Sequence, residues 1–364
     1  MDRIVRRGLS RWQAGFVLIL GLLPLLLATR GAAREQPALP YPAWQGETGL
    51  SVMTYNVEGL PWPARFGRGG SLARIGERLA AMRAANAQPR IILLQEAFSD
   101  DAKAIRTASG HRYAAFGPAI ELAGEPASSP ADLAFAAEAA FLKGERSGKL
   151  LDSGLVILSD YPILSVRRAA FPVSACAGYD CLANKGMVMA IVAMPGGLGP
   201  IAVVNLHLNS KRASGVDIER ANAAFRRQLE AVDHFLETNH VPGMPMIVAG
   251  DFNIGQSAAR RAMVMEMLAR HNGAAPLDAL SACSGECRKS LTADARNARH
   301  RAKDWQFLIP GAAADLAVRR IATPFGRESD GSMLSDHIGY TAYLSMAATG
   351  EAQPSPRGAS TIDG

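Results

Sequence analysis

Residues 187–206 read Met-Val-Met-Ala-Ile-Val-Ala-Met-Pro-Gly-Gly-Leu-Gly-Pro-Ile-Ala-Val-Val-Asn-Leu, which is two apolar runs separated by a glycine-rich turn. The runs, Met187–Ala193 and Ile201–Leu206, are short and rich in β-branched residues, as strands are. Because no helix fits between them, a sheet built only from parallel β-α-β units does not account for this region. The stretch predicts an α/β fold in which two mixed β-sheets form a sandwich with helices outside.

The alternation of short strands and amphipathic helices continues outward from this stretch in both directions. Further strand-like runs bounded by turn residues are Ser51–Asn56, Arg90–Leu94, Gly154–Leu158, Met246–Ala249, Trp305–Ile309 and Ile338–Leu344. Apolar residues recur at helical spacing in Ser71–Ala85 and Asp217–Thr238. The Ala-rich stretch Pro118–Lys149 interrupts this order, and we expect short helices in a long inserted loop there.

The first 33 residues have the layout of an export signal. Basic residues 1–12 precede a charge-free apolar run from Ala14 to Ala28, and small residues follow up to Ala33. The run is shorter than the roughly 20 residues that cross a bilayer as a helix. Residues 1–33 therefore predict a signal peptide, with an N-terminal membrane anchor as the alternative. We expect a linker at 34–48, the folded domain at 49–346 and a disordered tail at 347–364.

Composition and charge restrict the class of protein. The chain has 364 residues, of which 48% are hydrophobic and only 6% aromatic. These values exclude a largely disordered chain and argue against an extensive base-stacking platform. The formal net charge is +6, but cleavage after Ala33 would remove five arginines and one aspartate and leave +2. The net charge therefore gives no argument for nucleic acid as the partner.

The cysteines agree with export to the periplasm or the exterior. Cys176 and Cys181 form one close pair, and Cys283 and Cys287 form another. An even count in an exported protein indicates two disulfides, and the sequence leaves three connectivities open. A zinc site fits less well, because neither pair has two-residue spacing and no histidine accompanies them.

Polar residues stand at the ends of the predicted strands. The segments that share this feature are Tyr55-Asn56, Leu94-Gln95-Glu96, Asn205-Leu206-His207, Gly250-Asp251-Phe252-Asn253, Lys303-Asp304-Trp305 and Ser335-Asp336-His337. If the sheets converge at one edge, these strand ends surround a single cleft. Any one segment alone is more simply explained as a turn, a helix cap or a core histidine. Only the combination of the segments indicates a functional site.

The side chains expected in this cleft suit metal-assisted hydrolysis. Carboxylate and amide oxygens favour Mg²⁺, Mn²⁺ or Ca²⁺ over zinc or copper, and close carboxylates repel one another unless a divalent cation neutralises them. Two histidines without a nucleophilic serine or cysteine triad indicate attack by water on a phosphate ester. Neighbouring residues on a strand point to opposite sides, so Asp336 cannot orient His337, and Asp304 is the candidate for that role.

The order of these residues resembles that of the endonuclease/exonuclease/phosphatase superfamily, which has the DNase I-like fold. The resembling stretch runs from about Leu50 to Leu344, and the superfamily's order of Asn, Glu, His, Asp-x-Asn, Asp and Asp-His is complete in it. The resemblance implies a four-layer α/β sandwich of two mixed β-sheets flanked by helices. It also implies a divalent-metal-dependent phosphodiester hydrolase, in which water attacks phosphorus in line.

The resemblance further implies a role for each residue. Glu96, with Asn56 nearby, would hold Mg²⁺, and His337, oriented by Asp304, would be the general base. His207 would stabilise the phosphate or the leaving oxygen. The implied catalytic residues are His337, His207, Asp304, Asp251 and Asn253. The implied metal ligands are Glu96, Asn56, Asp251, Asn253 and Asp336, for one ion or two.

One segment distinguishes among the substrate branches of the superfamily. Residues 176–186 read Cys-Ala-Gly-Tyr-Asp-Cys-Leu-Ala-Asn-Lys-Gly, which is similar to the segment of bacterial neutral sphingomyelinases that ends in Asn-Lys-Gly. The resemblance implies that Lys185 contacts the substrate phosphate together with Asn184 and Asn253. The long aromatic hairpin with which secreted sphingomyelinases enter membranes is not evident. Leu60–Pro63 with Phe66 offers a smaller apolar contact.

We therefore expect an exported, monomeric enzyme that acts on a lipid headgroup in the manner of a sphingomyelinase or phospholipase C, with peripheral membrane contact. The first alternative is an exported DNase I-like endonuclease, since Arg296, Arg299 and Lys303 would share one helical face before Asp304. An inositol-phosphate-type phosphatase and a non-catalytic scaffold on the same fold are the others. Mg²⁺ is the expected cofactor and Mn²⁺ its alternative.

Overall fold

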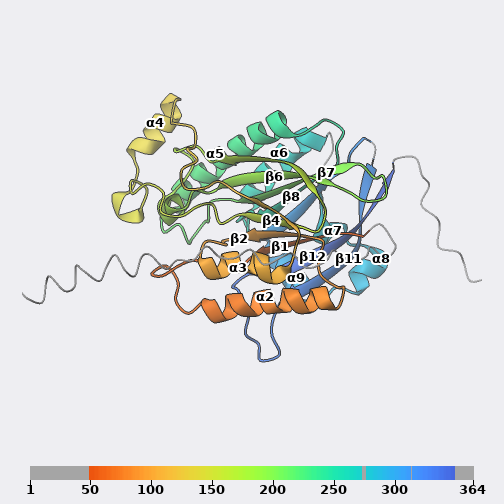
Figure 1. Ribbon diagram of the computed structural model, residues 1–364. Helices are drawn as coiled ribbons and strands as arrows, with labels where there is room; N and C mark the ends of the chain where they lie inside the picture. Colours follow the sequence, from red (N-terminus) through yellow and green to blue (C-terminus); the bar gives the residue numbers. More distant parts are fainter. Residues whose placement is uncertain (1–48, 273–275, 313, 349–364) are drawn as a thin grey trace, which may run out of the picture. The chain divides into compact units, whose positions relative to one another are not determined.

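The computed structural model describes residues 49–272, 276–312 and 314–348. Two six-stranded β-sheets pack face to face, in the strand orders β11-β12-β1-β2-β4-β3 and β5-β6-β7-β8-β10-β9. Helices cover the outer face of each sheet (Figure 1). This confirms the predicted four-layer α/β sandwich of two mixed sheets. The predicted signal peptide, the linker and most of the predicted tail lie outside the described residues.

The element bounds are as follows. The first sheet contains β1 (Leu50–Asn56), β2 (Ile91–Gln95), β3 (Tyr113–Phe116), β4 (Val156–Ser159), β11 (Ala314–Phe325) and β12 (Gly339–Ala348). The second contains β5 (Ile163–Ala170), β6 (Gly186–Ala193), β7 (Pro200–His207), β8 (Met246–Asp251), β9 (Leu277–Asp278) and β10 (Asp304–Ile309). The α-helices are α2 (Gly69–Ala84), α3 (Asp100–Ser109), α4 (Pro130–Ala137), α5 (Ile218–Asn239), α6 (Ala258–Asn272), α7 (Ala279–Ala282), α8 (Gly285–Lys289) and α9 (Ala293–Arg301). Short 3₁₀ turns span Phe141–Lys143 and Gly178–Leu182.

The stretch that predicts the fold forms β6 and β7, an antiparallel pair. The chain then crosses through α5, whose N-terminus is capped by the side chain of Asp217, and returns as β8 in parallel with β7. In the first sheet, α2 connects the parallel strands β1 and β2 in the same way. Each sheet therefore has a pair of parallel strands at its centre. The carboxyl ends of the two strands in such a pair lie at the same edge of the sheet.

The interface between the sheets is largely apolar, and Asn205 forms a buried polar link across it. Its core includes Val52 and Leu93 of the first sheet and Val203 of the second. Asn205 of β7 donates through Nδ2 to the main-chain oxygens of Leu94, at 2.9 Å, and Val156, at 3.0 Å. Its Oδ1 accepts from the side chain of Gln95 at 2.7 Å. The link fixes β7 against β2 and β4 just before these strands reach the predicted site residues.

We expect Asn205→Leu to lower the free energy of unfolding by about 2–3 kcal/mol. The substitution removes the side-chain donor to two buried main-chain oxygens and the shortest of the hydrogen bonds that the Gln95 amide donates. Denaturant unfolding measures the change, and Asn239→Leu at the end of α5 is the control, since Asn239 bonds only within its own helix, to Phe235. Equal losses in the two variants would contradict a role for the link.

The sequence does not predict β3, β5, β9 and β11, and these are the edge strands of the two sheets. An edge strand has one paired neighbour and tolerates polar side chains, so its hydrophobic alternation is weak. In β5 the sequence Val-Arg-Arg breaks that alternation, and in β11 another arginine pair does so. At the other end of the domain, β12 continues through Ala348, two residues past the predicted boundary at 346. The predicted insertion holds α4 and the first 3₁₀ turn.

Two disulfides join neighbouring cysteines, Cys176 to Cys181 and Cys283 to Cys287. This is the local pairing among the three connectivities. The first disulfide encloses most of the 3₁₀ turn that precedes β6, and the second connects the end of α7 to α8. Disulfides are typical of an oxidising compartment. Within the described ranges, no helix is both long and apolar enough to cross a membrane.

Candidate active site

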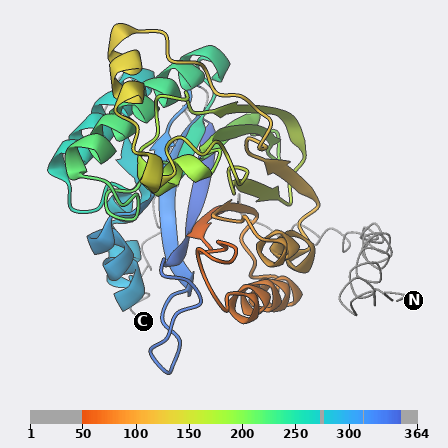
Figure 2. The same ribbon diagram turned by 90° about the vertical axis from the view of Figure 1, so that its left-hand side faces the viewer.

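The strand ends at one edge of both sheets bring most of the predicted site residues together. Figure 2 shows the ribbon turned by 90° from Figure 1, with helices outside the two sheets. In the second sheet, His207 of β7 lies beside Asp251 of β8, and Asp251 lies opposite Asp304 of β10. Two groups of ligand atoms, each within 4.8 Å, result: Glu96, His207 and Asp251, and Asp251, Asp304 and His337. Asp251 belongs to both groups and is therefore the centre of the site.

His337 and Asp304 form a hydrogen-bonded pair. The Nδ1 atom of His337 lies 2.9 and 2.8 Å from the two carboxylate oxygens of Asp304, and both side chains are buried. Its Nε2 atom lies 3.7 Å from Asp251 Oδ2 and 3.3 Å from Lys303 Nζ. The contact is the one that the sequence predicts, and it leaves Nε2 as the ring atom that faces the other site residues.

The protonation of His337 depends on the charges around it. Burial alone lowers the pKa of this imidazole, but the charges of Asp304 and Asp251 and the hydrogen bond to Asp304 outweigh burial and raise the pKa to about 9. At neutral pH the ring is therefore protonated while these carboxylates are uncompensated. A positive charge beside Asp251 is needed to bring His337 into the form that accepts a proton.

We expect the His337 imidazole of the metal-free protein to titrate near pH 9 and Asp251→Asn to lower its pKa. Proton NMR of the ring measures both values. The raised pKa stabilises the folded state fully below the unfolded value of about 6.5, and this stabilisation declines as the pH rises through 9. Its maximum is on the order of 3 kcal/mol. His337→Gln should therefore have a flatter profile of unfolding free energy between these pH values, and identical profiles would contradict the assignment.

Glu96 and Asp251 form an acidic pair that lacks a lysine or arginine ion-pair partner among the described residues. Burial raises the pKa of both carboxyls. The amino group of Asn56 donates to both, at 2.9 Å from Glu96 Oε1 and 3.1 Å from Asp251 Oδ2. Two uncompensated acids this close favour a divalent cation, and their hard oxygens suit Mg²⁺ or Mn²⁺.

Asn56 differs from its predicted role as an oxygen ligand. Its Oδ1 accepts the main-chain N–H of Glu58 at 3.0 Å. Since a main-chain nitrogen only donates, this bond fixes which end of the amide is the oxygen and turns the amino group toward the acids. Asn56 therefore positions Glu96 and Asp251.

Asp336 also differs from the prediction, because it joins neither group of ligand atoms. Its side chain is 51% exposed at the rim, 3.8 Å from His337 Nε2 and 3.9 Å from Lys303 Nζ. The residues around it form a bend before β12 instead of strand, and the carboxylate of Glu58 accepts the main-chain N–H of Asp336 at 3.0 Å. The bend turns Asp336 outward and His337 inward.

Lys185 determines the chemical state of His207. Its ammonium donates to Asp180 at 2.6 Å and lies 3.0 Å from His207 Nε2. Because an ammonium only donates, Nε2 is the acceptor and Nδ1 carries the proton. Burial, followed by the charge of Lys185, lowers the pKa of His207 well below its usual range, so the ring is neutral. Its Nδ1 is buried and has no hydrogen-bond partner among the described residues.

Asn184 does not have the free donor that a phosphate contact needs. Its amino group donates to the main-chain oxygens of Ala119, at 2.6 Å, and Leu122, at 2.9 Å, and the residue is 2% exposed. Both N–H bonds are used, and the remaining amide oxygen cannot bind an anion. In place of its predicted role, Asn184 anchors the start of the 118–149 insertion to the segment before β6.

Several strand ends in the cleft have strained backbone. Glu58, Glu96 and Asn253 have φ values of 51°, 55° and 50°, in the left-handed region that costs a non-glycine residue about 1 kcal/mol. Asn253 is held there by its Nδ2, which donates to Leu208, and by its main-chain oxygen, which accepts from Arg260. Such strain is retained where a side chain must be aimed at a site.

Three charged residues in or behind the site are not assigned by the sequence: Glu58, Asp180 and Arg260. Glu58 and Asp180 stand within five residues of Asn56 and Lys185, and this proximity is the only available signal. No such signal marks Arg260, which lies on α6. It is buried, and its guanidinium donates to Asn222 Oδ1 and to the main-chain oxygens of Asn209 and Asn253.

The family model described as "Endonuclease/Exonuclease/phosphatase family" matches residues 53–279, and the chain belongs to this family. The family is hydrolytic, depends on divalent metal ions, and includes phosphodiesterases, phosphatases and nucleases. No curated protein sequence matches the chain.

The structure is similar to solved structures of bacterial proteins. Beta toxin from Staphylococcus aureus is 19% identical with a TM-score of 0.54, over 81% of this chain and 99% of that one. Sphingomyelinase C from Streptomyces griseocarneus is 21% identical with a TM-score of 0.53, over the same shares of both chains. A variant of the Staphylococcus aureus beta toxin with bound magnesium ions is 15% identical, covers the same shares and has a TM-score of 0.52. At these identities the likeness shows a shared DNase I-like fold.

Proposed function

We propose that this chain is an exported, Mg²⁺-dependent phosphodiesterase that cleaves a phospholipid headgroup, as a sphingomyelinase or phospholipase C does. The observation that carries the proposal is the His337–Asp304 pair, whose Nε2 atom faces Asp251, the residue that also stands beside Glu96 in a group of possible metal ligands. These residues fit a divalent cation, which when bound supplies positive charge against the developing charge on phosphate oxygens. Glu96 and Asp251 would hold it, and Mn²⁺ is the alternative ion.

Each step of the proposed reaction is assigned to particular residues of the chain. Nε2 of His337 takes a proton from the attacking water while Asp304 holds the proton on Nδ1. The neutral His207 offers its unpaired Nδ1–H to a phosphate or leaving oxygen, and Lys185 holds His207 in that tautomer. Water displaces the alcohol in line, so the P–O bond to the alcohol breaks as the bond to water forms.

A lipid substrate is supported by the surface beside the site. The loop that follows Asn56 exposes Trp62 at 73% and Phe66 at 72%, an arrangement that suits peripheral contact with a lipid surface. The lipid proposal also draws on the structural likeness to a protein described as sphingomyelinase C. The predicted signal peptide and the two disulfides support export, and we take the exported enzyme to be a monomer.

The test is hydrolysis by the chain without residues 1–33, supplied with Mg²⁺ and a panel of substrates. Sphingomyelin and phosphatidylcholine micelles, plasmid DNA and an inositol phosphate represent the candidate classes. We expect release of phosphocholine, its loss with a chelator and its return with excess Mg²⁺. Plasmid cleavage without lipid hydrolysis would replace the lipid phosphodiesterase with an endonuclease, and no hydrolysis of any substrate would indicate a scaffold.

The endonuclease alternative depends on the basic residues near α9. The structure places only Arg296 and Arg299 on this helix, because α9 ends at Arg301 and Ala302 adopts the left-handed conformation, with φ 50°. Lys303 therefore does not share their helical face as predicted. Its ammonium lies in the catalytic cleft, 3.3 Å from His337. The arginines instead line a separate pocket.

A further inference from the structure

A pocket of about 510 Å³ lies behind one wall of the catalytic cleft. It is lined by residues 255–258, which follow Asn253, and by Arg261, Arg296, Arg299 and His300. Two main-chain hydrogen bonds form the shared wall, from Phe252 to Lys303 at 2.9 Å and from Gly255 to Ala302 at 2.8 Å. The same short segments therefore carry catalytic residues and pocket residues.

The ionisable side chains that line this pocket are all basic. Its lining holds three arginines and a histidine, and no aspartate or glutamate. Among the residues that the structure describes, none of the three arginines has an ion-pair partner; Arg296 donates to the main-chain oxygen of Leu291 and Arg261 lies over the ring of Trp305. Some arginines elsewhere are ion-paired, as in Arg83–Asp160 and Arg220–Glu145, and within the described part of the chain the arginines of this pocket are not. Several arginines that line one pocket without acids favour a phosphate, which guanidinium groups bind through paired hydrogen bonds.

The start of α6 adds to the positive potential. Ser257 and Ala258 stand at the first turn of this 15-residue helix, and both line the pocket. The free main-chain N–H groups and the dipole of a helix N-terminus favour an anion. Arg261 belongs to α6 as well, but Arg296 and Arg299 come from α9, so a second element contributes positive charge to the pocket.

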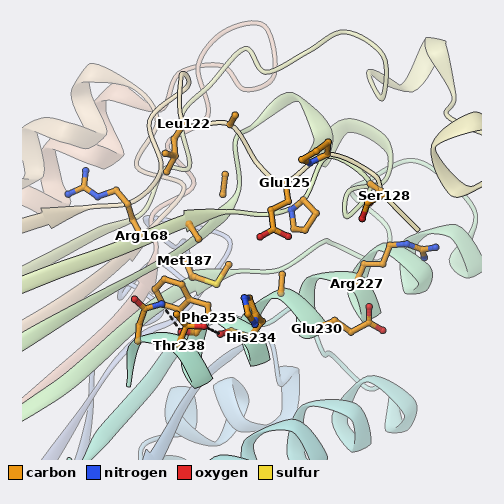
Figure 3. A pocket seen from close by; sticks show the side chains of 18 of the residues that line it. Leu122, Glu125, Ser128, Arg168, Met187, Arg227, Glu230, His234, Phe235 and Thr238 are labelled. Atoms are coloured by element: carbon orange, nitrogen blue, oxygen red, sulfur yellow. Dashed lines mark hydrogen bonds between the residues drawn. The ribbon is translucent and has the colours of Figure 1, made fainter. Parts of the chain in front are cut away.

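A second cavity, of about 530 Å³, is lined by acidic as well as basic residues (Figure 3). It lies between α5, β5 and the insertion, and Figure 3 shows Arg168 and Arg227 at opposite ends of it. Glu125 and Glu230 also line it, and Arg227 is paired with Asp132 at 3.0 Å. Its charges are mixed and partly neutralised, so they specify no ligand.

We propose that the basic pocket, defined by Arg261, Arg296, Arg299 and His300, binds a phosphate group other than the one that is hydrolysed. The group is a phosphate monoester on a lipid headgroup or free phosphate. A compact, concave pocket suits a headgroup-sized ligand better than duplex DNA, which needs an extended groove along its backbone. If the proposed function holds, on which this consequence rests, the pocket directs the enzyme to membranes that contain anionic phospholipid.

Binding of inorganic phosphate to the metal-free protein tests the site without any reaction. We expect binding by isothermal titration calorimetry, weakened about tenfold or more in Arg261→Gln/Arg299→Gln. Arg112→Gln, at an exposed position outside the pocket, is the matched control and should bind as the wild type does. His337→Ala separates the two sites: it should retain phosphate binding, and loss in this variant with retention in the double variant would overturn the proposal.

Vesicle binding distinguishes the sources of the phosphate. We expect phosphatidylcholine vesicles that contain phosphatidic acid to bind wild type more tightly than phosphatidylcholine alone, and the difference to disappear in the double variant. Phosphate binding without a vesicle effect would identify free phosphate as the ligand. A double variant that loses only binding to a DNA duplex would overturn the assignment. Because no arm requires hydrolysis, an inactive protein that still binds phosphate would refute the proposed function and leave the pocket in place.

Discussion

His337→Ala is expected to lower kcat for Mg²⁺-dependent phosphodiester hydrolysis by about 10³-fold or more. The variant removes the ring whose Nε2 faces Asp251 and whose Nδ1 lies 2.8 Å from Asp304, so the attacking water loses its proton acceptor. Steady-state kinetics on the substrate that the panel identifies give kcat and KM separately. KM should change little, because the ring acts on water and leaves substrate binding to other groups.

His234→Ala is the control for this variant, since His234 lies on α5 at the cavity of Figure 3, away from the catalytic cleft. It should have wild-type kinetics. Retention of more than about a tenth of the wild-type kcat by His337→Ala would contradict its role as the general base, because general-base catalysis contributes more than that. The proton acceptor would then be another group in the cleft.

Glu96→Gln should abolish the response of the protein to Mg²⁺. The substitution keeps the shape of the side chain and removes one of the two adjacent acids that would hold the ion. We expect kcat/KM to fall about 10³-fold at millimolar Mg²⁺ and the rise of Tm on adding Mg²⁺ to disappear. Without metal the variant should be as stable as wild type or more so, because burial raises the pKa of Glu96 and the charge of Asp251 adds to that effect.

Glu138→Gln is the matched control, because its carboxylate is 78% exposed and belongs to neither group of ligand atoms. It should keep the wild-type rise of Tm with Mg²⁺. An unchanged Mg²⁺ response in Glu96→Gln would mean that the ion binds elsewhere. Calorimetric titration with Mg²⁺ shows directly whether the affinity or only the activity is lost.

The sequence predicts the centre of the site because strand geometry is local. His207, Asp251 and Asp304 stand at strand ends, and the pairing of β7, β8 and β10 places them in one row. The hydrophobic pattern of the sequence predicts these strands, and it therefore also predicts where they end. The apolar hairpin of β6 and β7 excludes a purely parallel sheet for the same reason.

The roles of the residues around the centre depend on partners that are distant in sequence. The side-chain amide of Asn184 donates to the main-chain oxygens of Ala119 and Leu122. Asp336 is turned to the rim by a bend that the carboxylate of Glu58 stabilises. No periodicity in the sequence marks such contacts, because they form only when loops from different parts of the fold meet. The same holds for the pocket arginines, which α6 and α9 bring together only in the folded protein.

Hydrolysis of sphingomyelin in ¹⁸O-labelled water, with Mg²⁺, tests the central claim most directly. If water attacks phosphorus, mass spectrometry should find one ¹⁸O atom in the released phosphocholine and none in the lipid alcohol. His337→Ala should release almost no labelled product under the same conditions. Label in the lipid alcohol, or labelled phosphocholine formed equally well by His337→Ala or without a divalent metal ion, would contradict the account.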